Sequence, residues 1–297
     1  MKTPKIIIHK ILFLVISLVL FSACEREETL QPKNIFENGD SESTTELDQY
    51  LKTTFRDPYG SIIHYKFVDQ FIDPTKSATP PRLEVVKPVS ELIEQAWIQP
   101  YNVASDQGES FLNQYFPAEI VILGSPIFNS NGTITLGIAD SGVRVTLTQA
   151  NDFIVGGDNT AWTIQTFRTL HHEFAHIIDQ TFQFDIESFF NISKDNYTSS
   201  GTWFTISETE AIERGMVTPY ATSAPGEDFA ETIAFIITTD PAEFESKYLD
   251  TSTCTTQACT DGKNRIREKY DRVIKYMNED VGIDLLVLRD EFLKSIN

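Results

Sequence analysis

Two histidines and a glutamate at helical spacing are the residues of this chain that most clearly predict chemistry. The segment His172-Glu173-Phe174-Ala175-His176 places its two histidines four positions apart. On a helix, side chains with this spacing lie on one face about 5–6 Å apart, so both imidazoles can reach one metal ion. Glu173 is then placed to take a proton from a metal-bound water. The segment predicts half of a zinc site, and a hydrolase is the first functional hypothesis.

The surrounding sequence predicts a helix that can hold these side chains rigidly. Residues 162–183 contain neither Pro nor Gly, and apolar side chains recur every three or four positions. Asp158, Asn159 or Thr160 can cap the start of this helix. The alternative is a helix that carries two solvated histidines. His171 has no histidine four positions later, so we expect it to be packed or exposed rather than a ligand.

A catalytic zinc ion usually has three protein ligands and one open position, so a third ligand must come from elsewhere. A histidine six residues after His176 is excluded, because Phe182 stands there. The other common solution is an acidic residue from a later helix. The acidic candidates downstream are Asp179, Asp185, Glu187, Glu208, Glu210, Glu213, Glu227, Asp228 and Glu231.

Glu227 and Glu231 are distinguished from the other acids because they lie one helical turn apart. Residues 225–239 predict a helix, with Ser223 as a possible cap and a proline in the first turn. Glu227 can reach a metal between two helices, and Glu231 can hydrogen-bond a ligand histidine and orient its ring. Alternatively, acidic residues simply favour helix N-termini. That alternative explains Glu227 and Asp228 but not Glu231.

The two segments together resemble a known family. His172-Glu-Phe-Ala-His176-Ile-Ile-Asp is followed about fifty residues later by Tyr220, six further residues and Glu227-Asp-Phe-Ala-Glu231. This pattern is similar to the lethal-factor-like branch of the gluzincin metallopeptidases. It is closer still to the zinc-binding metallopeptidases found as lipoproteins in Bacteroidota. The resemblance covers residues 160–240, and Asp228 departs from it by standing where the toxin-like members carry an aromatic residue.

The resemblance implies a zincin-like fold, a Zn²⁺ cofactor, a peptide or protein substrate and a role for each matching residue. The implied zinc ligands are His172, His176 and Glu227. Glu173 would be the general base and Tyr220 the oxyanion stabiliser. The implied partner of a ligand histidine is Glu231.

The first residues predict export and anchoring. Residues 1–23 combine three lysines, an apolar stretch at 11–21 and a small-residue end before Cys24, which is typical of a secretory signal. The order Ser22-Ala23-Cys24 resembles a bacterial lipoprotein signal, in which Cys24 is lipidated. The alternatives are an ordinary signal peptide or a membrane anchor, but the apolar stretch is shorter than the about 20 residues that span a bilayer. We expect an outer-membrane lipoprotein that faces the periplasm or the cell surface.

Composition separates a tether from a folded domain and excludes one class of partner. Residues 24–54 are largely polar and are expected to form a flexible tether before a domain at 55–297. The chain has 43 acidic against 24 basic residues, so loss of the three leader lysines takes the net charge from −19 to −22. Such an acidic domain is not expected to bind nucleic acid.

The order of the predicted elements indicates an α+β fold. Residues 55–151 look strand-rich, with strands at 119–123, 133–137 and 143–147 and a short helix at 90–97. Residues 152–297 look helical, and strands followed by helices are typical of α+β proteins. The strand at 143–147 is the candidate sheet edge for pairing with an extended peptide, and an inner strand is the alternative.

Two cysteines remain after Cys24. Cys254 and Cys259 lie five positions apart in a polar segment, and a disulfide between them is plausible in an exported chain, although free thiols are the alternative. The leading interpretation of the whole sequence is a zinc-dependent metallopeptidase. The alternatives are a surface lipoprotein that keeps the fold but hydrolyses nothing, and a zinc hydrolase that acts on a non-peptide amide.

Overall fold

The computed structural model describes residues 45–66, 72–128, 134–135, 137–140, 143–198 and 201–296. Glu46–Asn297 form one structural unit. The predicted signal, Cys24 and most of the predicted tether lie outside the described residues. Within the described ranges, no helix is both long and apolar enough to span a bilayer.

Four of the described strands form a sheet with the order β1-β2-β6-β5. β1 (Ile62–His64), β2 (Glu119–Ile122) and β6 (Arg144–Leu147) are parallel, and Ile120 pairs with Val145 in the register of β2 and β6. Both faces of β2 and β6 are covered, as the apolar runs in these strands require. β5 (Gly137–Asp140) runs antiparallel to β6.

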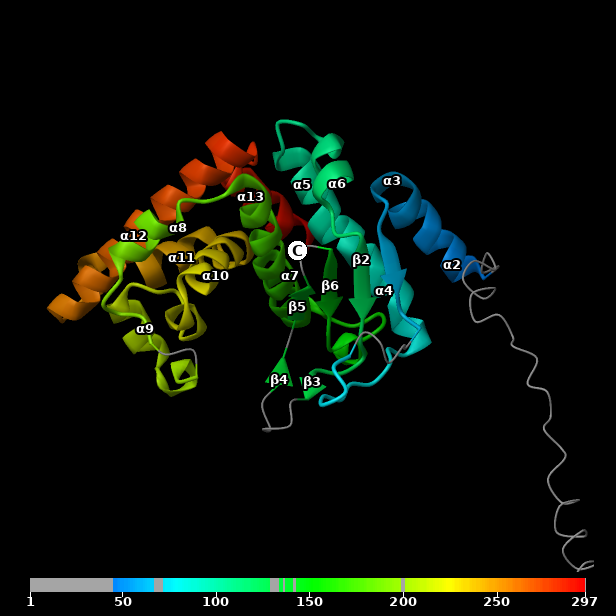
Figure 1. The fold of residues 1–297 in the computed structure, drawn as a ribbon, viewed down its shortest axis with the longest axis horizontal. Helices are drawn as coiled ribbons and strands as arrows, with labels where there is room; N and C mark the ends of the chain where they lie inside the picture. Colours follow the sequence, from blue (N-terminus) through cyan, green and yellow to red (C-terminus); the bar gives the residue numbers. More distant parts are fainter. Residues whose placement is uncertain are drawn as a thin grey trace, which may run out of the picture. The chain divides into compact units, whose positions relative to one another are not determined.

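The strand predicted to be the sheet edge is an inner strand. β6 lies between β2 and β5, so the prediction that residues 143–147 form the edge is wrong. β5 pairs antiparallel with the side of β6 that faces away from β2, which places β5 outside β6. β5 has one hydrogen-bonded neighbour among the described strands and runs alongside the long helix α7 (Figure 1). The segment predicted as a strand at 133–137 is divided between β5 and β4 (Ile134–Thr135), which pairs with β3 (Ile127–Phe128) in a separate two-stranded sheet.

The first half of the domain also contains more helix than the sequence predicted. The short helix expected at 90–97 is part of a continuous helical run made of α4 (Leu83–Ile93), η3 (Glu94–Ile98) and α5 (Gln99–Ala104). Pro88 and Pro100 both lie inside this run. η3 is a π-helical segment, and such wider turns are one way in which a helix accommodates a proline. α6 (Glu109–Tyr115) follows before β2.

The predicted tether ends earlier than expected. α2 (Glu46–Leu51) and η1 (Lys52–Arg56) form a helical segment, continued by α3 (Asp57–Tyr59). Leu51 is 6% exposed and Phe55 is fully buried. Tyr65 Oη donates a hydrogen bond of 2.8 Å to Asp48. Residues 46–54 therefore belong to the folded domain, because their apolar side chains at helical spacing pack against it.

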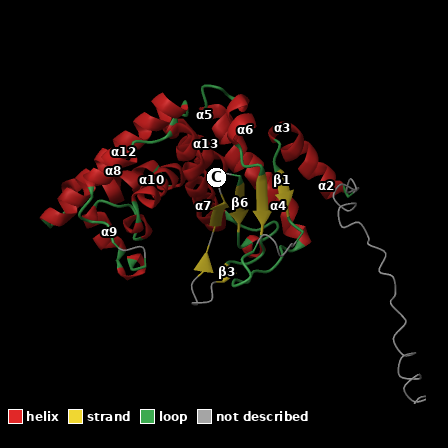
Figure 2. Cartoon of the chain, in the orientation of Figure 1, coloured by secondary structure: helices red, strands yellow, loops and turns green. Residues whose placement is uncertain are grey.

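After β6 the described chain consists of helices and loops (Figure 2). The helices predicted at 162–183 and 225–239 are both present, together with further helices. Their bounds are α7 (Thr160–Phe182), α8 (Ile186–Ile192), α9 (Glu208–Arg214), α10 (Pro225–Thr238), α11 (Pro241–Phe244), α12 (Gln257–Tyr276) and α13 (Leu285–Ser295).

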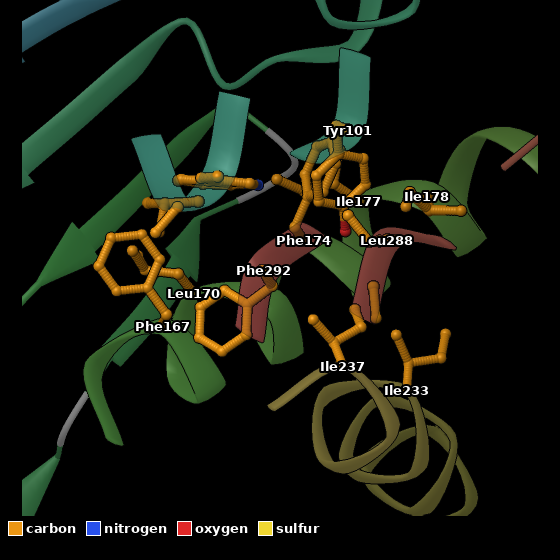
Figure 3. Close-up of a cluster of buried hydrophobic side chains, with 14 of the residues drawn as sticks. Tyr101, Phe167, Leu170, Phe174, Ile177, Ile178, Ile233, Ile237, Leu288 and Phe292 are labelled. Atoms are coloured by element: carbon orange, nitrogen blue, oxygen red, sulfur yellow. The ribbon is translucent and has the colours of Figure 1, made fainter. Parts of the chain in front are cut away.

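The core of this half is built around α7. Its apolar stripe packs against α10 and α13, and Phe174 lies close to Tyr101 from α5 (Figure 3). Ile233 and Ile237 come from α10, and Leu288 and Phe292 from α13. Burial of this stripe fixes the rotation of α7 about its axis, and that rotation decides where its polar residues point. The observed architecture is α+β and zincin-like, with every described strand before α7.

Candidate metal centre

α7 presents His172, Glu173 and His176 away from the core stripe. His172 is 6% exposed, whereas Glu173 and His176 are partly exposed. The helix begins where it was expected to begin, and Asp158 Oδ1 accepts a hydrogen bond of 2.9 Å from the Thr160 N–H. The motif therefore lies on one continuous helix, with its first histidine buried and its second partly exposed.

The first turn of α10 supplies an acidic side chain to the motif histidines. The helix starts at Pro225 after Ala224, whose methyl side chain cannot accept a hydrogen bond. The prediction that Ser223 caps the helix is wrong, because its Oγ donates a hydrogen bond of 2.7 Å to the Tyr220 carbonyl. α10 packs directly on α7. An added Cβ at Gly226 would lie only 4.0 Å from Cε1 of His176, which shows how closely the two helices approach.

Three ligand atoms converge between these helices. Nε2 of His172 and Nε2 of His176 lie 3.2 Å apart, and Oε2 of Glu227 lies 3.0 Å from the first and 3.5 Å from the second. A tetrahedral zinc ion with ligand distances of about 2.0–2.2 Å holds neighbouring ligand atoms about 3.3–3.6 Å apart. The three observed separations are close to that range. The donor set and its spacing therefore fit a zinc ion.

Further hydrogen bonds orient one of the histidines. Nδ1 of His172 lies 2.8 Å from Oε1 of Glu231, and since a carboxylate only accepts, Nδ1 carries the proton. This leaves Nε2 available to a metal. Thr218 Oγ1 donates a hydrogen bond of 2.6 Å to the other oxygen of Glu231. Sequence reasoning found Glu231 but missed Thr218, which no motif distinguishes from the other threonines.

The electrostatics of the site favour a cation. Burial alone would lower the pKa of His172, but hydrogen bonds to Glu227 and Glu231 raise it to about 10. Burial would raise the pKa of Glu227, but hydrogen bonds from His172 and His176 hold it well below its ordinary value. Unprotonated Nε2 of His172 and the carboxylate of Glu227 are both hydrogen-bond acceptors. Their close approach therefore requires a proton or a metal ion between them. Such a site binds one or the other.

Tyr220 lies next to the ligand His172. It begins η6 (Tyr220–Ser223), is 37% exposed, and its ring centroid lies 5.9 Å from that of His172. Its pKa is raised by burial and by the nearby Glu227 carboxylate, so the phenol keeps its proton and can donate it in a hydrogen bond. Trp203 packs edge-on against this ring at 5.1 Å, and sequence reasoning did not predict that contact.

The other acidic candidates lie elsewhere. Asp228 is fully buried and is paired with Lys269 rather than with the histidines. Glu208 pairs with Lys247, and Asp179 accepts a hydrogen bond from the backbone N–H of Phe184. Within the described ranges, the group of three that can hold a metal ion is His172, His176 and Glu227.

The remaining predicted residues are also placed. His171 is fully buried in the core, which is the packed alternative. Cys254 and Cys259 form a disulfide with a Cα–Cα distance of 5.6 Å, between η8 (Thr251–Thr253) and α12. Cys24 lies outside the described residues.

Comparisons with known proteins were made for the whole chain. Residues 40–286 match a family described as "Putative zinc-binding metallo-peptidase". The chain is similar to the crystal structure of a "putative zinc-binding metallo-peptidase" from Bacteroides caccae, with a TM-score of 0.69 and 27% sequence identity. That similarity covers 88% of this chain and 95% of the other. A search of curated proteins finds no match.

Proposed function

The chain belongs to this family of zinc-binding metallo-peptidases, and we propose that it hydrolyses peptide bonds by a gluzincin-type mechanism with Glu173 as general base. The observation that carries the proposal is the convergence of His172, His176 and Glu227, with ligand atoms 3.0–3.5 Å apart. Glu173 lies one residue after the first ligand on the same helix and is partly exposed.

Each residue has a distinct task in the proposed mechanism. His172, His176 and Glu227 would hold a zinc ion, which would supply a Lewis acid and lower the pKa of a water molecule to about 7. Glu173 accepts the proton of the attacking water and passes it to the leaving amine. Tyr220 donates a hydrogen bond to the oxyanion of the tetrahedral intermediate. Glu231, held by Thr218, keeps the ring of His172 in the orientation that presents Nε2.

The sheet edge supports a peptide as the substrate. β5 runs alongside α7 and pairs with β6 on one side only among the described strands. The backbone groups on its other side can therefore pair with an extended peptide, which would pass in front of the motif helix. This assigns to β5 the substrate-pairing role that the sequence suggested for residues 143–147.

The third ligand is tested by zinc stoichiometry. The wild type should bind one zinc ion, and Glu227→Ala should lose it. Glu208→Ala is the matched control, because Glu208 is an exposed glutamate that pairs with Lys247 and is not part of the ligand group. Retention of stoichiometric zinc by Glu227→Ala would show that another group completes the site.

The base is tested by Glu173→Gln. This variant should bind zinc as the wild type does and cleave a mixed-peptide substrate about 10²–10⁴-fold more slowly. Full activity in Glu173→Gln would refute the assignment. Zinc binding without cleavage of any peptide by the wild type would instead favour a binding lipoprotein or a hydrolase of another amide.

We further propose that Cys24 is lipidated and anchors the protein in the outer membrane. The support is the sequence of the first 24 residues, which resembles a lipoprotein signal. Cys24→Ala should release the protein from the membrane fraction. An equally firm association of Cys24→Ala and wild type with membranes would refute this localisation.

A further inference from the structure

A buried ion pair lies directly behind the ligand Glu227. The carboxylate of Asp228 is completely buried, and Lys269 from α12 is 1% exposed. Lys269 Nζ donates hydrogen bonds to Oδ2 of Asp228 at 2.5 Å and to the Gly215 carbonyl at 2.7 Å. Tyr197 Oη donates to the same oxygen of Asp228 at 2.7 Å. One carboxylate oxygen therefore joins α10, α12 and the loop after α8.

The position of Asp228 gives this pair control over the direction of Glu227. Successive residues of an α-helix point about 100° apart, so an anchor at Asp228 sets the rotation of the first turn and with it the direction of Glu227. Ala224 cannot cap this first turn and helix ends fray, so the buried hydrogen bonds of Asp228 add to the packing of α10 on α7 in fixing it. Buried ion pairs contribute little net stability compared with apolar side chains of similar volume. Fixing a geometry is the role that this pair can fill.

The same carboxylate also reaches the segment that carries Tyr220. Tyr197 is followed by Thr198, whose N–H donates a hydrogen bond of 2.7 Å to the Thr222 carbonyl. The hydroxyl groups of Thr198 and Thr222 lie 3.1 Å apart. Thr222 belongs to η6, the short helix that begins with Tyr220. The path from Asp228 through Tyr197 thus ends at Thr222, in the short helix that begins with the proposed oxyanion donor.

We propose that Asp228, Lys269 and Tyr197 are positioning residues that hold Glu227 and Tyr220 in place relative to the two histidines. The inference rests on the proposed function, since it assumes that Glu227 binds zinc and that Tyr220 acts in turnover. Lys269 and Tyr197 touch neither histidine and act through Asp228.

The first experiment separates positioning from stability with the double variant Asp228→Asn/Lys269→Met. It removes both charges and approximately keeps side-chain volume, so neither charge is left buried alone. The matched control is Lys263→Met, because Lys263 lies on the same helix, is 5% exposed and donates hydrogen bonds to the carbonyls of Ser246 and Asp250. Zinc affinity is measured by chelator competition, and ligand geometry by the visible absorption spectrum of the Co²⁺-substituted protein.

The double variant should bind zinc about tenfold or more weakly than the wild type, with an altered Co²⁺ spectrum. Lys263→Met should keep the wild-type affinity and spectrum even if it unfolds more readily. A folded double variant with wild-type zinc affinity and spectrum would overturn the proposal. If the double variant does not fold, Tyr197→Phe provides the decisive measurement, because it keeps the ring and the ion pair.

Tyr197→Phe should lower kcat while KM and zinc affinity stay near those of the wild type, because it frees the segment that carries Tyr220. An unchanged kcat in a folded Tyr197→Phe would overturn this branch. Failure of the proposed function would look different. If the wild type binds zinc but cleaves no peptide, kcat cannot be measured. Zinc affinity and the Co²⁺ spectrum still decide whether Asp228 and Lys269 position the ligand Glu227.

Discussion

His171 precedes the ligand His172 and allows a sharp test of how α7 is packed. Its ring centroid lies 5.8 Å from that of Tyr101 and 5.4 Å from that of Phe292. Neither ring nitrogen has a hydrogen-bond partner among the described residues. Burial lowers the pKa of His171 to about 3. In an unfolded chain the pKa of a histidine is about 6.5.

The sign of the effect follows from these two pKa values. As pH falls below about 6.5, the unfolded state takes up a proton on His171 while the native state does not, so the unfolded state is stabilised. The native protein therefore loses stability progressively from pH 6.5 down to about 3. From these values, His171 alone should cost about 2 kcal/mol of unfolding free energy between pH 7.5 and pH 5.

The perturbation is His171→Leu, which removes the titrating group with little change in volume. Urea unfolding of the two proteins is followed by circular dichroism from pH 7.5 to pH 5. EDTA is present, so that proton and metal competition at His172 is the same in both. The free energy of unfolding of His171→Leu relative to wild type should rise by about 2 kcal/mol across this range. Parallel stability curves would refute the description of His171 as neutral and buried.

Three further predictions concern the metal site and the disulfide. Glu231→Gln should weaken zinc binding by about 10–100-fold in a chelator competition, because the ring of His172 loses its charged partner. The control is Glu243→Gln, since Glu243 is exposed. Equal zinc affinities of Glu231→Gln and the wild type would contradict the role of Glu231. The pKa of His172 is raised to about 10, so this side chain is protonated in the metal-free protein. Zinc binding should displace that proton. Because of this proton alone, zinc affinity should increase about tenfold per pH unit. Calorimetry in two buffers of different ionisation enthalpy should detect the release of the proton, and identical heats in both buffers would argue against it. The variant Cys254→Ser/Cys259→Ser should unfold with about 2 kcal/mol less free energy, because the bridge closes a short loop in the unfolded chain; urea midpoints that do not change would contradict this.

The helices that carry the candidate site could be predicted because local signals define them. The apolar stripe of α7 and the proline at the start of α10 lie within single segments, and periodicity and turn chemistry report on such segments directly. The early start of the folded domain had a local signal too. Leu51 and Phe55 are four positions apart and both buried, but the polar residues around them made the segment look like a tether.

Strand order could not be predicted in the same way. β6 and β5 are both short, and which one forms the sheet edge depends on the pairing of β6 with β2, about 25 positions earlier. Proximity in sequence to α7 favoured β6 as the edge. The observed order is different, because β6 pairs with β2 on one side and with β5 on the other, which leaves β5 at the edge.

The choice between two adjacent acids shows the same limit at the level of one helical turn. Glu227 and Asp228 both occupy the first turn of α10, and helix propensity and dipole arguments favour them equally. The distinction comes from Lys269, 41 positions later on α12, whose buried ammonium group requires a carboxylate and takes that of Asp228. No pattern in the sequence marks this lysine, since its sequence environment on α12 is charged and most lysines are exposed. Because Asp228 is paired with Lys269, the rotation of α10 leaves Glu227 as the acid that faces the two histidines.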